Sequence, residues 1–176
     1  LSHNTNKVVN LDGDQTEIVS GTQIHKIGHS YRTFYMIEFA GINPENGNPQ
    51  FYKNDLLEDG SYNKEITEKA SEAKSIMLDK HAEPNVTGGL YNSFRYKWFD
   101  LSFLFNYQFG GWSYDTWAQK TEHGGYDMEA NIPTYYADSW KKPGDVTKYE
   151  QFYEKSSSVA MHKITNSRRL HSTDYF

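Results

Sequence analysis

The chain has 176 residues, a formal charge of −5 and an apolar fraction of only 36%, while aromatic residues reach 16%. The charges form no basic face of the kind that nucleic-acid binding requires, and the absence of cysteine excludes a disulfide framework and thiolate metal sites. No run approaches the ~18 apolar residues of a membrane-spanning helix, but a transmembrane strand needs only about 10 alternating residues, so a membrane protein is not excluded.

The first third of the chain predicts turns and short strands. The segment 7–14 is expected to be a strand end that enters a turn at Asp12-Gly13, because Asp-Gly favours turns. A strand is expected over 30–40, rich in aromatic and β-branched residues, followed by a dense turn cluster at 41–49. A further strand is expected at 50–52.

The segment from Glu65 to Leu78 has good helix formers but only a thin apolar stripe, so it predicts either a short helix or an irregular loop. His25 and His29 are four residues apart, but their surroundings indicate strand or loop rather than helix. The other histidines have no companions at ligand spacing, and we therefore expect no metal site.

The stretch from Gly88 to Gly111 has the clearest pattern in the chain. Leu90, Phe94 and Tyr96 share one face of a first strand, and a short connection at 97–100 leads into a second. In the second strand, apolar and mostly aromatic residues alternate with smaller or polar ones; the apolar set is Leu101, Phe103, Phe105, Tyr107 and Phe109. The stretch therefore predicts an antiparallel hairpin with one aromatic face.

Two environments accept such a hairpin, and periodicity does not separate them. A soluble sandwich places the aromatic face in its core. A membrane barrel places that face in lipid and the polar face in its lumen. The aromatic cluster of Tyr96, Trp98 and Phe99 at the turn favours the barrel, because aromatic girdles sit at the membrane boundary in such proteins.

From residue 112 to about 158 the alternation ends, and we expect a long irregular excursion. Short turns on one side and long loops on the other are typical of bacterial outer-membrane barrels. The aromatic residues of the excursion either contact a substrate or partner, or hold the loop against itself, and we favour packing for any single one. These residues are Trp112, Tyr114, Trp117, Tyr135, Tyr136 and Trp140.

Four phrases resemble the C-terminal half of SusC/RagA-like, TonB-dependent outer-membrane transporters, and they come in that family's order. The first spans 30–52 and resembles "sfyGyewaGvdpetGdpqyy"; the second spans 84–111 and resembles "PdvtGGlsntfrYknfdLs…yqfGg". The third, 140–147, resembles "aWtkPGDvT", and the fourth, 167–175, resembles "SsrrlydgdYirL". Met36-Ile37 and Ser172-Thr173 depart from the family, since glycine is usual at both places.

The resemblance implies an all-β fold, an antiparallel transmembrane β-barrel that is large and plugged, of which residues 1–176 form part of the C-terminal barrel domain. It implies about six to eight strands in this chain, with the plug domain elsewhere. The implied function is TonB-dependent import of a glycan or peptide across the bacterial outer membrane, with a SusD-like surface lipoprotein as partner, TonB reached through the plug, and outer-membrane lipid around the wall.

No catalytic residue, cofactor or metal is expected, because no nucleophile elbow, phosphate loop or dinucleotide fingerprint is present. The chain is therefore not expected to be an enzyme. The alternative is a soluble, secreted β-rich protein that binds or cleaves carbohydrate, which accounts equally well for the aromatic content but not for the ordered phrases.

Overall fold

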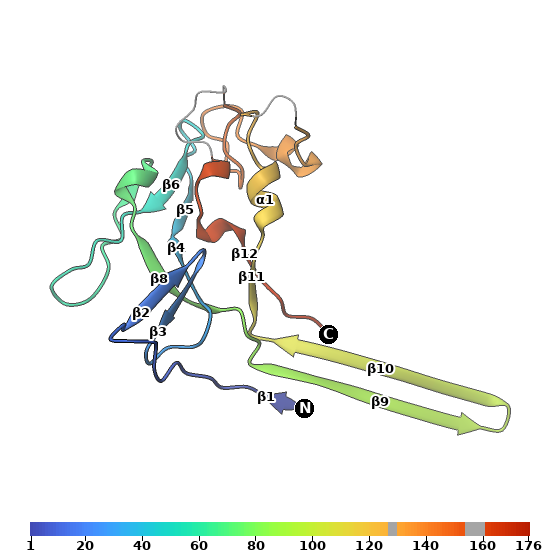
Figure 1. Ribbon diagram of the computed structural model, residues 1–176. Coiled ribbons are helices and arrows are strands. Elements are labelled where there is room, and N and C mark those ends of the chain that lie inside the picture. Colours follow the sequence, from blue (N-terminus) through green and yellow to red (C-terminus); the bar gives the residue numbers. More distant parts are fainter. Residues whose placement is uncertain (127–129, 154–160) are drawn as a thin grey trace. The chain divides into compact units, whose positions relative to one another are not determined.

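A computed structural model of the chain describes residues 1–126, 130–153 and 161–176, and Figure 1 shows that strands dominate it. The strands are β1 (Ser2–His3), β2 (Glu17–Ser20), β3 (Gln23–Lys26), β4 (Thr33–Ile37), β5 (Phe39–Ile42), β6 (Pro49–Tyr52), β7 (Ile66–Thr67), β8 (Ser75–His81), β9 (Val86–Tyr96), β10 (Phe99–Phe109), β11 (Trp112–Tyr114) and β12 (Leu170–Ser172). The helical elements are α1 (Thr116–Thr121) and four 3₁₀ turns, η1 (Ala70–Glu72), η2 (Thr134–Asp138), η3 (Met161–Lys163) and η4 (Ser167–Arg169).

The strands form four separate sheets, whose orders are β1-β9-β10, β2-β3-β4-β8, β5-β6-β7 and β11-β12. The ladders β1–β9, β9–β10, β2–β3, β3–β4, β5–β6 and β6–β7 are all antiparallel, which confirms the expected all-β fold class. No closed barrel is formed by the described residues. No helix among them is both long enough and apolar enough to cross a membrane.

Of the strands in the described part of the chain, only β9 and β10 have the ~9–11 residues of a transmembrane strand, so the expectation of six to eight barrel strands stays a prediction. β9 and β10 have 11 residues each, whereas β8, with 7, is the longest of the others. The strands outside the hairpin therefore build small sheets of short strands.

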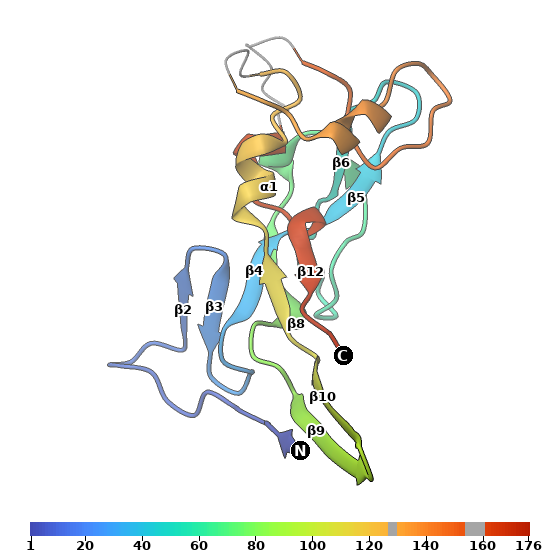
Figure 2. The same cartoon turned by 90° about the vertical axis from the view of Figure 1, so that its right-hand side faces the viewer.

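The chain divides into two compact units. Unit 1 comprises Leu1–Phe34, Leu78–Ser113 and His171–Phe176; unit 2 comprises Tyr35–Met77 and Tyr114–Leu170. Unit 1 contains the β9–β10 hairpin. In unit 2, Figure 2 shows α1 and the 3₁₀ turns gathered with β5 and β6.

Unit 2 has a small hydrophobic core beneath these loops. Phe51, Met161 and Ile164 are buried, and Phe39 packs edge-on against Phe51 with a distance of 6.2 Å between ring centroids. The predicted strand over 30–40 is divided into β4 and β5, and the predicted strand at 50–52 is β6. Because β6 alternates outward and inward, Phe51 is fully buried while its neighbours are partly exposed.

Two local expectations need correction. The segment 65–78 contains no α-helix and is occupied by β7, the η1 turn and the start of β8. Its apolar stripe is too thin to bury one face of a helix, whereas pairing of Thr67 with Phe51 buries part of it as a strand. Asp12-Gly13 does form a turn, with Gly13 at φ +66°, but residues 7–11, expected to be a strand end, form no strand. The first hairpin is instead β2–β3, which turns at Gly21 with φ +59°.

Candidate functional site

The β9–β10 hairpin is in register along its whole length, from Phe99 opposite Tyr96 to Phe109 opposite Val86. Residues that face each other across an antiparallel pair lie on the same side of the sheet, so the register gathers the aromatic residues of both strands on one face. That face carries Phe99, Leu101, Phe103, Phe105, Tyr107, Phe109, Val86, Leu90, Phe94 and Tyr96, interrupted by Gly88 and Asn92. The expected hairpin and its faces are therefore confirmed.

The turn is tighter than the sequence predicted. Lys97 and Trp98 alone connect the strands, and Lys97 takes the left-handed conformation, with φ +52°, that two-residue hairpin turns use. Trp98 is 90% exposed. Arg95 and Asp100, which face each other on the polar side, form an ion pair of 2.7 Å next to the turn.

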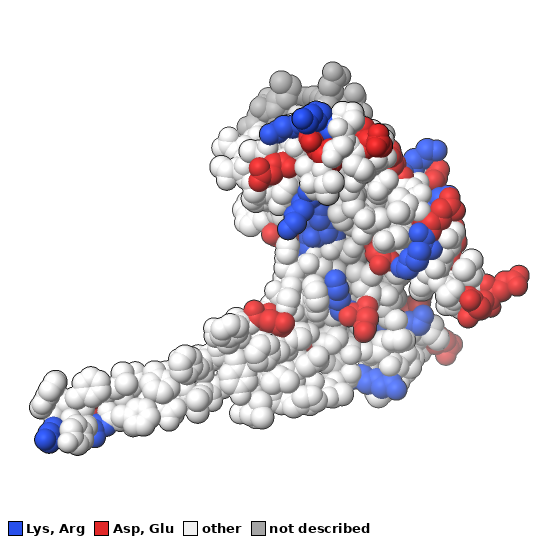
Figure 3. All heavy atoms as spheres, turned by 180° about the vertical axis from the view of Figure 1, so that it is seen from behind, with Lys and Arg blue, Asp and Glu red and all other residues white. Residues whose placement is uncertain are grey.

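Apart from Arg95 and Asp100 beside the turn, neither strand carries a charged residue. Figure 3 shows the hairpin as an uncharged rod, with basic groups at its tip. Its aromatic face is open: Phe105 is 57% exposed and Leu101 is 44% exposed. Large apolar surfaces are rarely left open to water, so this face is a candidate surface for contact with lipid or with another protein.

The opposite face is mainly small and polar, with Thr87, Ser93, Ser102, Asn106 and Gln108 among its residues. Tyr91 and Leu104 form one apolar pair in it, directly opposite each other. The hairpin thus has two chemically different sides.

Tyr107 shapes the aromatic face near its far end. A Cβ atom built on Gly88, the residue opposite, would lie 2.5 Å from the Tyr107 Cζ atom, so the ring lies directly over the glycine. The ring therefore fills the space that a side chain at position 88 would take.

Unit 2 contains a contact between two distant segments that we name the loop clasp: the turn 43–49 and the loop 140–151. The Pro44 carbonyl accepts hydrogen bonds from the indole Nε1 of Trp140 and the amide of Gly144, both at 2.9 Å. The amide of Gln151 donates to the Gly47 carbonyl at 3.0 Å. A Cβ atom on Gly47 would lie 2.5 Å from the indole, so the ring rests on the glycine backbone.

A single carboxylate organises the turn side of the clasp. The side-chain amides of Asn43, Asn46 and Asn48 all donate to Glu68, at distances from 2.5 to 3.1 Å. Burial opposes ionisation of Glu68, but these hydrogen bonds prevail and its pKa is lowered.

A buried ion network adjoins the clasp, because Glu150 of the loop 140–151 belongs to both. Arg168 donates to Glu150 at 2.5 Å and to Glu122 at 2.6 Å, and the Nε of Arg169 lies 3.2 Å from Glu122. Tyr136 adds a hydrogen bond of 2.5 Å to Glu150, which is completely buried. Desolvation and the Glu150 charge raise the pKa of Tyr136, so its hydroxyl remains a donor.

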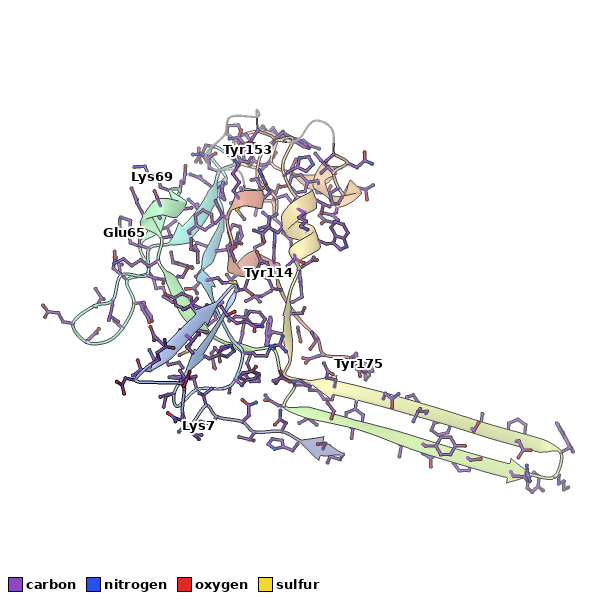
Figure 4. The ribbon with its side chains drawn as sticks, viewed as in Figure 1. Lys7, Glu65, Lys69, Tyr114, Tyr153 and Tyr175 are labelled. Carbon is purple, nitrogen blue, oxygen red and sulfur yellow. The ribbon has the colours of Figure 1, made fainter. Side chains whose placement is uncertain are left out.

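The six loop aromatics that were candidates for substrate or partner contact are in different environments. Tyr136 is buried in the ion network and Trp140 is half-buried in the clasp. Trp112 is half-buried with the Lys80 ammonium 4.0 Å from its ring centroid, and Tyr114, labelled in Figure 4, donates to Gln119 at 3.0 Å. Trp117 and Tyr135 remain open, at 73% and 42% exposure.

Burial, with the neighbouring Glu122 charge next, raises the pKa of Tyr135 to about 12, and its hydroxyl donates to Glu122 at 3.2 Å. His25 lies in β3 and stacks on Tyr31 rather than pairing with His29. Within residues 1–126, 130–153 and 161–176, no three potential ligand side chains of His, Asp or Glu gather as they would around a metal ion.

Sequence reasoning missed the ion network and the clasp. Glu122 and Glu150 have no motif around them, whereas the ends of the clasp were already marked, since the first and third family-like phrases contain Pro44 and Trp140. The fourth phrase reaches the same region, because Ser167 accepts a hydrogen bond from the Phe39 amide at 3.0 Å.

No family model matches the chain. The TonB-dependent receptor P39 of Formosa agariphila is 39% identical over 62 residues, which are 35% of this chain and 6% of that protein. A structure of the RagAB peptide transporter aligns with 98% of this chain and 18% of the matched one, at 24% identity and a TM-score of 0.75. The open-open state of the RagAB peptide importer aligns with 96% of this chain and 17% of the matched one, at 22% identity and a TM-score of 0.74. The chain thus spans less than a fifth of the length of these proteins.

Proposed function

Because the chain has the sequence phrases and the fold of a SusC/RagA-like, TonB-dependent outer-membrane transporter, we propose that it forms part of the barrel wall and the outer loops of a nutrient importer. Its location is the bacterial outer membrane, as for those relatives. The relatives are named as a receptor and as transporters, which agrees with the expectation that the chain is not an enzyme.

The observation that carries this proposal is the hairpin. Strands of 11 residues extend about 37 Å at ~3.4 Å per residue, and a tilt of ~45° reduces this to about 26 Å of height. The apolar band of an outer-membrane barrel is about 25 Å tall. In a hairpin of this length, the only charged strand residues are Arg95 and Asp100 beside the turn, on the polar face. Such a hairpin fits lipid on its aromatic face and the barrel lumen on the other.

The ends of the hairpin support an orientation. Outer-membrane barrels have short turns on the periplasmic side and long loops outside the cell. The two-residue turn at Lys97-Trp98 therefore belongs to the periplasmic side, where Tyr96 and Trp98 fit the aromatic girdle. The opposite end of the hairpin, at Val86 and Phe109, belongs to the extracellular side.

In this function the chain performs no covalent chemistry. A SusD-like lipoprotein would deliver a glycan or a peptide at the extracellular mouth, and TonB would act on a plug domain from the periplasm. The RagAB relatives are described as a peptide transporter, which makes peptides one of the two substrate classes to test.

The soluble carbohydrate-binding alternative is less well supported. It needs the aromatic face of β10 as a dry core between two sheets, whereas Phe105 is 57% exposed within the described chain. This alternative would need a sheet from another molecule to cover the aromatic face.

Spin-label scanning of the full-length transporter in lipid bilayers tests the proposal. Single cysteines replace residues 101–109 in turn, and the label at each position is relaxed by oxygen, which partitions into lipid, and by a water-soluble nickel chelate. Oxygen is expected to dominate at Leu101, Phe103, Phe105, Tyr107 and Phe109, and the chelate at Ser102, Asn106 and Gln108.

The matched pair is Phe105→Cys and Asn106→Cys, which are neighbours in sequence but lie on opposite faces. An accessibility without a period of two residues, or with aromatic positions shielded from both reagents, would show that the hairpin is not in the barrel wall.

A further inference from the structure

Unit 2 contains a surface hollow of about 610 Å³ beside the ion network. Its wall is aromatic on one side, where Tyr135 stacks on Tyr149 with 5.1 Å between ring centroids. The rest of the lining is polar or charged apart from Val146, and consists of Asp138, Ser139, Lys141, Asp145, Thr147 and Lys148.

Both tyrosines of the aromatic wall contact the buried ion network. The Arg168 guanidinium lies 5.2 Å from the Tyr149 ring centroid and pairs with both Glu122 and Glu150. The hydroxyl of Tyr135 donates to Glu122. Tyr135 and Tyr149 therefore both contact the same buried ion network. A ligand would bind to rings that are already ordered, so its binding free energy would not be reduced by the entropy lost in ordering them.

Charges of both signs face the hollow. Lys141, Lys148 and Asp138 form no ion pair with any residue that the structure describes. Asp145 accepts hydrogen bonds from the backbone amides of Lys141 and Lys142, both at 3.1 Å. A ligand that covers unpaired lysine and aspartate groups without compensating them leaves desolvated charges, which is costly.

We propose that this hollow is a peptide-binding subsite of the transporter, with the Tyr135–Tyr149 wall receiving an apolar or aromatic side chain and the charged rim pairing with charged groups of the peptide. The inference rests on the proposed import function and assigns it a substrate class. A peptide carries groups of both signs and backbone amides that match the lining, whereas a neutral glycan offers hydroxyls but no opposite charge for the lysines and aspartates.

Direct binding to the purified full-length transporter tests the subsite. The probes are fluorescent peptides of equal length that are acidic, basic or carry both charges, together with a malto-oligosaccharide and an oligogalacturonate of similar size. The peptide with both charges is expected to bind most tightly, and its affinity is expected to fall as salt rises.

Variants locate the binding. Lys148→Gln and Tyr135→Ala are each expected to weaken the peptide with both charges by about tenfold, and Asp138→Lys to shift preference from basic to acidic peptides. Lys142→Gln is the matched control, because Lys142 is adjacent to Lys141 but does not line the hollow. Melting temperatures of all variants show whether the fold is intact.

Two results would overturn the subsite. Tighter binding of either oligosaccharide than of any peptide would assign the other substrate class, and equal peptide affinity in Lys148→Gln, Asp138→Lys and native protein would place binding elsewhere. Both outcomes leave the import function standing, since cellular uptake that depends on the transporter is measured separately.

Discussion

At the scale of single residues, Gly47 makes the closest backbone contact with the Trp140 ring in the loop clasp. Its φ of +72° is unfavourable for any residue with a Cβ, and that Cβ would lie 2.5 Å from the Trp140 indole. Gly47→Ala should therefore incur about 1–2 kcal/mol of backbone strain and a further ~1–3 kcal/mol of steric overlap. Hydrogen exchange in the full-length protein should show faster exchange of the Gly47 and Gln151 amides, which are hydrogen-bonded in the clasp.

Gly144→Ala separates the two contributions. Gly144 has a similar φ of +94°, but nothing lies within 4 Å of the position that its Cβ would take. Gly144→Ala should therefore destabilise the protein through backbone strain alone, without steric overlap. Equal effects of the two variants would mean that the indole does not rest on Gly47.

Arg168 is the cation that both buried carboxylates share. Arg168→Met leaves Glu150 without a cation and Glu122 with Arg169 alone. Removing one partner of a buried ion pair typically costs about 3–5 kcal/mol, so the loop 134–153 should become far more sensitive to limited proteolysis. Adding Glu150→Gln should restore part of the resistance, and a single variant as resistant as native protein would contradict the role of the network.

His162 predicts a pH dependence. Burial lowers the pKa of His162 below 6.5, and the nearby Lys163, His123 and Arg169 lower it further. The negative charge of Glu150 acts in the opposite direction and raises it. The unfolded state binds the proton near pH 6.5 and the folded state only at lower pH, so the contribution to stability is complete above 6.5 and is lost as pH falls below it.

His-selective NMR of the full-length protein, assigned with His162→Gln, measures that pKa directly. The same variant should lessen the decrease in melting temperature between pH 7 and pH 5. A His162 pKa at or above 6.5 would exclude the effect.

At the scale of elements, the hairpin predicts opposite outcomes for neighbouring substitutions. Phe105→Arg places a charge on the proposed lipid face near the middle of β10, at an expected cost of about 2–4 kcal/mol, whereas Asn106→Arg lies on the proposed lumen face and should be tolerated. Folded protein in the outer membrane, scored as the heat-modifiable band on unheated gels, should decrease only for Phe105→Arg. A decrease of equal size for both would contradict the assignment of the faces.

The hairpin was predictable because its information is local. Period-two alternation fixes which residues share a face, and the register follows once the turn is placed. The segment 65–78 was not predictable in the same way, since its choice between helix and strand depends on pairing with β6. The helix-forming composition was outweighed by that tertiary contact.

At the scale of the whole molecule, the proposed import makes uptake depend on energy and on a partner. Deleting the gene for the full-length transporter should abolish uptake of its nutrient, and a protonophore should do so in wild-type cells. The transporter isolated in mild detergent should bring a surface lipoprotein with it. Uptake that survives the protonophore would contradict TonB dependence, and would leave the membrane placement of the hairpin unaffected.

The sequence by itself determined the all-β class, the aromatic hairpin and the likeness to SusC/RagA-like transporters, because alternation and ordered phrases are properties of neighbouring residues. Only the tertiary structure decided which loop aromatics are free. Trp140 is taken by a hydrogen bond to Pro44, 96 residues away, and Tyr136 by buried Glu150, while Tyr135 remains open. Long-range contacts of this kind carry no local periodicity, so burial and ion pairing at these positions follow from the fold and not from the pattern.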